Sequence, residues 1–184
     1  MRKSIKLILI IMFVFSTSIL FAQKQEEYKA PNMPINKETT LISYNGEIEM
    51  QGTKDLLFRK GITWYHSYIK NSKNFLKEEN VLEGKFVARP RFKIMSPPPK
   101  KGIQTMAGVV NYTLIMTFKE GKYSYEITDM KLQQASDYPI ENWMKKDSKS
   151  YQESWEYYLM EVDKNIQELI SDMKKRMAYK QESK

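Results

Sequence analysis

Hydrophobic and polar residues alternate most regularly over residues 109–130, where two runs rich in β-branched and aromatic residues flank a Glu120-Gly121 pair. This pattern predicts a β-hairpin in which glycine supplies the positive φ of a two-residue turn. The turn sets apolar residues opposite one another on one face of the sheet: Phe118 with Tyr123, Met116 with Tyr125 and Leu114 with Ile127. The other face then carries mostly polar pairs: Thr117 with Ser124, Ile115 with Glu126 and Thr113 with Thr128. A shift of one residue would mix the two faces, so the pattern selects this register.

Three further stretches have strand-like spacing of apolar residues. Residues 39–50 predict a first strand, with a turn or bulge at Asn45-Gly46. Residues 81–94 alternate in two pieces, separated at Pro90 because proline cannot donate a ladder hydrogen bond. The three prolines that follow, within residues 96–102, predict a stiff extended connection.

Two other segments repeat their apolar residues with the period of a helix. The first begins with Thr53 as N-cap and runs to about residue 70. It has two adjacent apolar stripes, formed by Leu57, Gly61, Trp64, Tyr68 and by Phe58, Ile62, Tyr65, Ile69. So wide an apolar face predicts packing on a sheet and on a second element, and Gly61 indicates a close approach.

The second predicted helix spans residues 150–177, with Ser150 and Glu153 as a capping box. At 1.5 Å per residue it would be on the order of 40 Å long, which is more than strands of eight to ten residues need. We therefore expect its last turns to overhang the sheet with their apolar residues, Leu169, Ile170, Met173 and Met177.

The order of these elements is strand, helix, four strands, helix, which predicts an α+β fold of two layers. An antiparallel sheet would carry both helices on one face and leave the other face open. We expect residues 23–38 to be a flexible leader, residues 39–178 a single domain and residues 179–184 a tail.

The N-terminus has the order of charged, apolar and small residues that is typical of a secretory signal peptide. Three bases precede an apolar run over residues 7–15, and the segment ends at Ala22, after which we expect cleavage. The apolar core is short for a membrane span, although an uncleaved N-terminal anchor is the alternative. The sequence therefore predicts an exported protein, periplasmic or secreted, with no membrane span after cleavage. The chain contains no cysteine, so neither a lipid anchor on cysteine nor a disulfide is available.

Three short motifs resemble the bacterial domain-of-unknown-function family numbered 4468, which has a TBP-like fold. They are GTKDLLFR from Gly52 to Arg59 with Trp64 behind it, VNYTL from Val110 to Leu114, and KEGKYSYEITD from Lys119 to Asp129. The resemblance covers roughly residues 40–130. It implies a TBP-like fold and an exported location but no activity, because the family has none assigned.

Reactive groups in a catalytic or metal-binding pattern are scarce. The single histidine, His66, falls in the polar arc of the first helix, and with no cysteine it cannot complete a zinc cluster. The glycines are scattered, so no phosphate-binding loop is present and no cofactor is expected. Carboxylates on predicted strand faces leave a hydrolase as one alternative function. The candidates for that chemistry are Glu47, Glu49, Glu126 and Asp129.

One charge asymmetry singles out a candidate binding site. Between Glu83 and Glu120 there are seven bases and no acid. Removing residues 1–22 takes away three bases and no acids, which leaves 27 bases against 22 acids and a net charge of +5. The basic stretch therefore exceeds the net charge of the whole mature chain. The residues proposed for binding are Lys85, Arg89, Arg91, Lys93, Lys100 and Lys101.

These observations favour a non-catalytic binding module of the bacterial envelope. Its partner would be an anionic envelope component or another envelope protein. A second alternative to the binding module is a structural protein that self-associates through the C-terminal helix. Nucleic acid is not expected as a partner, because wedging into the minor groove needs apolar residues on the open sheet face. That face offers Thr113, Thr117, Ser124, Glu126 and Thr128.

Overall fold

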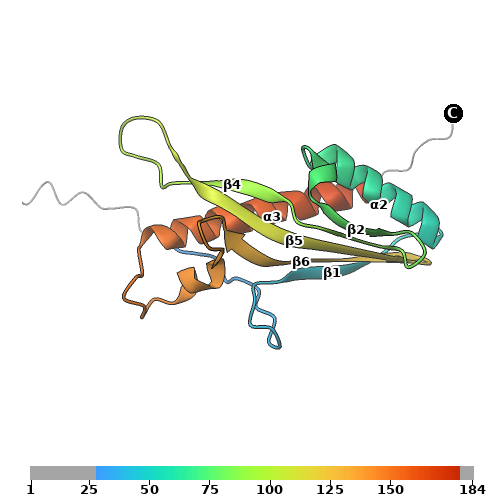
Figure 1. Ribbon diagram of the computed structural model, residues 1–184, viewed down its shortest axis with the longest axis horizontal. Coiled ribbons are helices and arrows are strands. Elements are labelled where there is room, and N and C mark those ends of the chain that lie inside the picture. Colours follow the sequence, from blue (N-terminus) through green and yellow to red (C-terminus); the bar gives the residue numbers. More distant parts are fainter. Residues whose placement is uncertain (1–27, 179–184) are drawn as a thin grey trace, which may run out of the picture.

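The computed structural model describes residues 28–178. The predicted signal peptide, the first residues of the predicted leader (23–27) and the predicted tail lie outside this range. The chain forms an antiparallel sheet with two helices on one of its faces, as the sequence predicts (Figure 1). No helix within residues 28–178 is long and apolar enough to cross a membrane.

The sheet is built around one long hairpin. Its seven strands are β1 (Tyr44–Glu49), β2 (Leu76–Asn80), β3 (Lys85–Ala88), β4 (Arg91–Met95), β5 (Met106–Lys119), β6 (Lys122–Leu132) and β7 (Tyr138–Pro139). Their order is β1-β6-β5-β3-β2, while β4 also pairs with β5 and β7 with β6. The hairpin of β5 and β6 therefore forms the centre of the sheet. The shorter strands β1 and β7 pair with β6, and β3 and β4 pair with β5.

The register of this hairpin is the one that the hydrophobic pattern predicts. Phe118 pairs with Tyr123, Met116 with Tyr125, and Leu114 with Ile127, and the polar pairs also fall as expected. Gly121 in the turn has a φ of +74°, a conformation that glycine adopts without strain. The five apolar side chains predicted to lie beneath the helices are buried: Leu114, Met116, Phe118, Tyr125 and Ile127.

The first helix, α2 (Lys54–Tyr68), begins where the sequence predicts. The Thr53 side chain accepts a hydrogen bond from the backbone N–H of Leu56 at 3.3 Å and so caps the helix. Gly61 brings α2 against β5, because a Cβ at this position would lie 2.2 Å from the Phe118 ring. The close approach expected from this glycine is confirmed.

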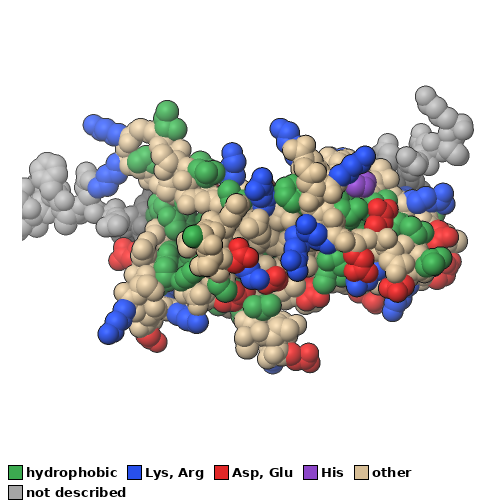
Figure 2. Space-filling view, viewed as in Figure 1, with side chains coloured by type: hydrophobic (Ala, Val, Ile, Leu, Met, Phe, Trp, Pro, Cys, Tyr) green, Lys and Arg blue, Asp and Glu red, His purple; other side chains and the backbone are tan. Residues whose placement is uncertain are grey.

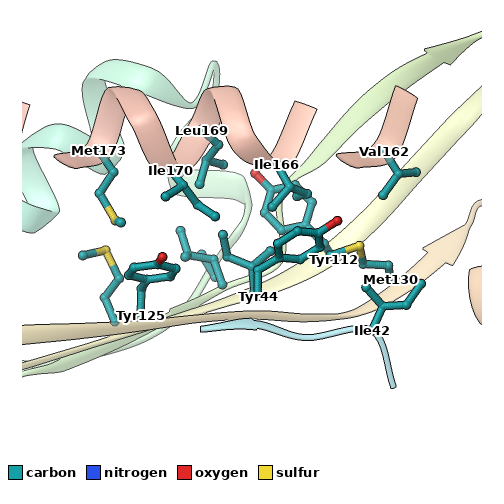
Figure 3. Packing of buried hydrophobic residues seen from close by; sticks show 14 of the residues in the cluster. Ile42, Tyr44, Tyr112, Tyr125, Met130, Val162, Ile166, Leu169, Ile170 and Met173 are labelled. Atoms are coloured by element: carbon teal, nitrogen blue, oxygen red, sulfur yellow. The ribbon is translucent and has the colours of Figure 1, made fainter. Parts of the chain in front are cut away.

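The second helix, α3 (Ser154–Ala178), differs from its prediction at both ends. It starts four residues later, and the Ser150 hydroxyl contacts that of Ser148 at 2.9 Å, so the predicted capping box is wrong. Its last turns do not overhang the sheet. Their apolar residues are buried in the common core, as Figure 3 shows in part: Leu169, Ile170, Met173 and Met177. This burial removes the reason for proposing self-association through the end of the helix.

Two strands and two short 3₁₀ helices were not predicted. Polar residues dominate β2, whose sequence is LKEEN, and β7 contains only two residues. The 3₁₀ segments are η2 (Ser72–Asn74) and η3 (Ile140–Met144), and η3 buries Trp143 within the polar stretch that follows the hairpin. Such elements form through tertiary contacts, and local pattern does not reveal them.

The first strand is shorter than predicted and contains no turn. Its ladder with β6 is regular, with Asn45 opposite Glu126 and Gly46 opposite Tyr125, so the expected turn or bulge at these residues is wrong. A Cβ on Gly46 would lie 2.8 Å from the Tyr125 hydroxyl. The glycine is therefore explained by the tyrosine side chain that lies over it.

The segment from residue 28 to residue 43, which overlaps the predicted leader, packs against the body. Met33 is buried, Ile35 forms a bridge with Ile42, and the Ala30 N–H donates to the Glu156 carboxylate at 2.7 Å. Part of the predicted leader, from residue 28 onward, therefore makes specific contacts with the body. The polar composition of this segment did not indicate these contacts.

Glu156 holds this segment and the loop before α3 together. Its buried carboxylate accepts the Ala30 N–H and the Tyr151 hydroxyl, the latter at 2.9 Å, and pairs with the Lys146 ammonium at 2.6 Å. Burial of the carboxylate opposes its ionisation. The hydrogen bonds from Lys146, Ala30 and Tyr151 together outweigh burial and lower the pKa of Glu156 from 4.5.

A pH dependence of stability follows from this lowered pKa. Because the folded pKa lies below the unfolded one, the contribution of Glu156 is complete above pH 4.5 and is lost as the pH falls through the folded pKa. Glu156→Gln should lower the free energy of unfolding by about 1–3 kcal/mol at pH 7. Urea unfolding at several pH values should show this difference shrinking below about pH 4.5. A difference that stays constant down to pH 3 would contradict the assignment.

Candidate functional site

The face of the sheet opposite the helices is lined by alternate residues of each strand. On β5 and β6 these are half-buried side chains whose neighbours along the strand point into the core: Thr113, Ile115, Thr117, Ser124, Glu126 and Thr128. The buried residues of α2 and α3 belong to the core on the other side. Neither helix therefore covers this surface, which we call the open face.

Three of the predicted binding residues form a row on the open face. Ala88 of β3 pairs with Leu114, and Arg91 of β4 pairs with Asn111, so both strands keep one register with β5 across Pro90. The Tyr112 N–H donates to the Pro90 carbonyl at 3.1 Å, which continues the ladder there. Arg89, Arg91 and Lys93 consequently alternate along the exposed face of one continuous ladder with β5, and we call them the basic row.

The partners of the basic row on β5 carry no charge. Arg91 lies opposite Asn111 and Lys93 opposite Val109, and the shared register places Arg89 opposite Thr113. The Arg91 guanidinium also lies over the Phe75 ring, 5.5 Å from its centroid, and donates to the Gln133 side chain at 3.4 Å. These contacts orient Arg91. Neither of them involves an acid, so they do not neutralise its positive charge.

The other predicted residues lie apart from the basic row. Lys85 shares the open face but sits four residues from Arg89, which is about 13 Å along an extended strand. It also pairs with Glu78 at 3.4 Å. Lys100 and Lys101 are exposed on the connection between β4 and β5, which projects beyond the sheet (Figure 1). The structure thus divides the six residues into a row of three, a distant lysine and a projecting pair.

Lys131 is a base of the open face near the basic row that was not predicted. Lys131 of β6 lies opposite Asn111, so Arg91, Asn111 and Lys131 form a line across three strands. A register shift between Asn111 and Thr113 brings it there, next to Asp129, whose φ is +52°. Without this bulge, Lys131 would pair with Val110 on the helix side. It is also paired with Asp129 at 2.9 Å, which weakens its charge at this surface.

A depression of about 340 Å³ lies further along the open face. It is lined by Asn45, Gly46, Glu47, Ile115, Thr117, Ser124, Tyr125 and Glu126. Two of the predicted catalytic carboxylates are therefore brought together here, while Glu49 and Asp129 are not. Glu47 pairs with Lys122 at 2.9 Å, and Glu126 accepts a hydrogen bond from the Ser43 hydroxyl at 3.1 Å. Glu47 is thus partnered by a lysine of β6, and Glu126 by the hydroxyl of the residue before β1.

Comparison with known proteins places this sheet in a family. Residues 44–133 match the family described as "Domain of unknown function (DUF4468) with TBP-like fold". These residues are a DUF4468 domain. The match contains β1 to β6 and α2, hence the open face and the basic row, while α3 follows it in the sequence.

Solved structures of the same fold confirm the architecture. A DUF4468 family protein from Bacteroides ovatus ATCC 8483 superposes with a TM-score of 0.64 at 13% identity, covering 88% of this chain and all of its own. A TBP-like protein from Parabacteroides distasonis ATCC 8503 gives a TM-score of 0.61, also at 13% identity, covering 81% of this chain and 99% of its own. At such identity the likeness concerns the fold alone. No curated protein matches the sequence.

Two other polar residues of the DUF4468 domain, His66 and Tyr44, have structural partners. His66 is exposed on α2, and its Nδ1 lies 2.8 Å from the Ser72 hydroxyl. The buried Tyr44 hydroxyl donates to Asp163 of α3 at 2.7 Å. Burial is the larger cause of the raised pKa of Tyr44, and this hydrogen bond raises it further. Among residues 28–178, no group of three or more His, Asp or Glu side chains could hold a metal ion. The basic row and the open face therefore remain the candidate site.

Proposed function

We propose that this protein is an exported, non-catalytic binding module and that the basic row contacts an anionic partner. The observation that carries the proposal is the alternation of Arg89, Arg91 and Lys93 on one exposed strand face, opposite uncharged residues of β5. Successive members lie about 7 Å apart along the strand. Such regular spacing suits a partner that carries several negative charges in sequence, which in the bacterial envelope means an anionic glycan, a lipid surface or an acidic protein.

A binding role is supported by the way the domain uses its charged groups. Acidic residues of the open face are engaged by neighbours, as Glu47 is by Lys122, whereas the basic row is not balanced by acids across the strands. A surface of one sign raises the local concentration of oppositely charged ligands. Guanidinium groups add bidentate hydrogen bonds to carboxylate, sulfate or phosphate oxygens.

Binding to a sulfated polysaccharide resin, measured as the salt concentration needed for elution, tests the basic row. A variant with Arg89→Ser, Arg91→Ser and Lys93→Ser should elute at clearly lower salt than the wild type. At low salt its affinity should be lower by about tenfold or more. The matched control removes three exposed lysines elsewhere, through Lys149→Ser, Lys164→Ser and Lys175→Ser. Equal elution of the two variants would show that only net charge matters and would refute the site.

Export is proposed from the N-terminal pattern, whose residues lie outside the described range. Cleavage after Ala22 would leave Gln23 at the N-terminus of the mature protein. Intact-mass measurement of the protein recovered from the envelope fraction checks this. A mass that still includes Met1 would contradict the cleavage.

A further inference from the structure

The connection between β4 and β5 forms an arm, residues 96–105, with a closed base. The Ser96 N–H donates to the Thr105 carbonyl at 2.8 Å, and their hydroxyls lie 2.7 Å apart. The Gln104 side-chain amide donates to the Ser96 carbonyl at 2.6 Å and to the Tyr157 hydroxyl of α3 at 2.9 Å. These bonds tie the base of the arm to the body, so its outer residues are held away from the sheet (Figure 1).

The outer part of the arm combines an apolar side chain with basic ones. Ile103 is 89% exposed, the joint highest value among the large apolar residues of the described chain. Lys100 and Lys101 precede it and are exposed as well. Figure 2 shows apolar and basic side chains together on this projection. Prolines 97 to 99 restrict the backbone beside them, which lowers the entropy lost when the tip is immobilised on a partner.

A second apolar tip in the same protein provides a comparison. Leu82, in the turn between β2 and β3, is also 89% exposed. Its charged neighbours are mixed: Glu83 lies beside it and Glu78 and Glu79 are in β2, while the Lys54 ammonium donates to the Leu82 carbonyl at 2.7 Å. The two tips thus expose similar apolar side chains, but acids accompany the bases at the turn and no acid lies in the arm, so an anionic surface would attract the arm more strongly than the turn.

We propose that the tip of the arm docks on an anionic lipid surface. Ile103 enters the boundary between headgroups and acyl chains, and the ammonium groups of Lys100 and Lys101 remain at the level of the lipid phosphates. A lipid surface fits this chemistry because it offers negative charge and an apolar layer at adjacent depths, whereas a glycan offers the charge alone. The inference rests on the proposed function in that it names one class of anionic partner.

Cosedimentation of the mature protein with vesicles tests the docking. Wild type should bind vesicles of equal parts phosphatidylglycerol and phosphatidylcholine and should not bind pure phosphatidylcholine. Ile103→Ser should weaken binding about tenfold or more, since a buried isoleucine side chain contributes to association roughly in proportion to its area. Lys101→Ser should weaken it about fivefold. Leu82→Ser is the matched control, because it removes an equally exposed leucine, and it should leave binding unchanged.

The outcomes separate this inference from the proposed function. The arm proposal is overturned if Ile103→Ser binds vesicles as well as wild type does, or if wild type does not bind anionic vesicles. This holds even if the basic row variant loses its polysaccharide binding. Conversely, Ile103→Ser that loses vesicle binding supports the arm even if the basic row variant elutes normally. Soluble glycerol phosphate carries the headgroup charge without acyl chains. Release of the protein from vesicles by millimolar amounts of it would contradict insertion of Ile103.

Discussion

Leu114→Ala should lower the free energy of unfolding by about 2–5 kcal/mol. Leu114 is fully buried in the middle of β5, where Ala88 and Ile127 flank it on the neighbouring strands. Both neighbours belong to regular ladders, so the backbone cannot close around the missing atoms and a cavity would remain beneath the helices. Urea denaturation followed by circular dichroism measures the change directly.

The adjacent residue provides the control for this prediction. Thr113 lies on the open face and is half-buried, so Thr113→Ala should change stability by no more than about 1 kcal/mol. Both variants replace one residue of the same strand by alanine, which cancels most of the difference in strand propensity. Similar losses at the two positions would show that the assignment of the faces is wrong.

The hairpin could be predicted because one local rule decided it. A two-residue turn at Glu120-Gly121 gave a register in which every apolar pair shares a face, and any shift would have exposed Phe118 or buried a lysine. The same rule fails beyond Thr113, where an extra residue near Asp129 shifts the pairing. A bulge of this kind depends on the twist of the completed sheet, so sequence alone could not show that Lys131 joins the open face.

The helices show where a local signal can mislead. Thr53 caps α2 as expected, since its side chain has a free backbone N–H within reach. The pattern from Ser150 to Glu153 looks equally suitable as a cap. However, residues 150–153 lie in the loop before α3, which begins at Ser154. The overhang of α3 was expected from its length, but the buried Met177 shows that the helix end contributes to the common core.

The candidate site was predicted in composition and only in part in geometry. The run of bases was visible in the sequence, and alternation placed Arg91 and Lys93 on one face. That Arg89 shares this face depends on the ladder continuing past Pro90, through the hydrogen bond from Tyr112. The pairing of Lys85 with Glu78 could not be foreseen, because β2 itself was not predicted. Distances between segments remote in sequence require the fold.

Gly61→Val should lower the free energy of unfolding by about 3 kcal/mol, and Gly61→Ala by about 1–2 kcal/mol. Alanine improves the helix propensity of this position by about 1 kcal/mol, so a simple helix would become more stable. Here a Cβ would lie 2.2 Å from the Phe118 ring, which is itself fully buried and in contact with Phe58 and Phe86. The ring has no free space to enter, so α2 must move away from the sheet and lose contacts along its length.

A double-mutant cycle identifies the Phe118 ring as the cause. Phe118→Leu alone should destabilise by about 1 kcal/mol, but in its presence Gly61→Ala should cost less, because the atoms that clash have been removed. Thr63→Ala, at an exposed position of the same helix, controls for propensity and should be neutral or slightly stabilising. If the two costs simply add, the ring is not the obstacle. Glycine at position 61 would then serve the conformation of α2 rather than its closeness to β5.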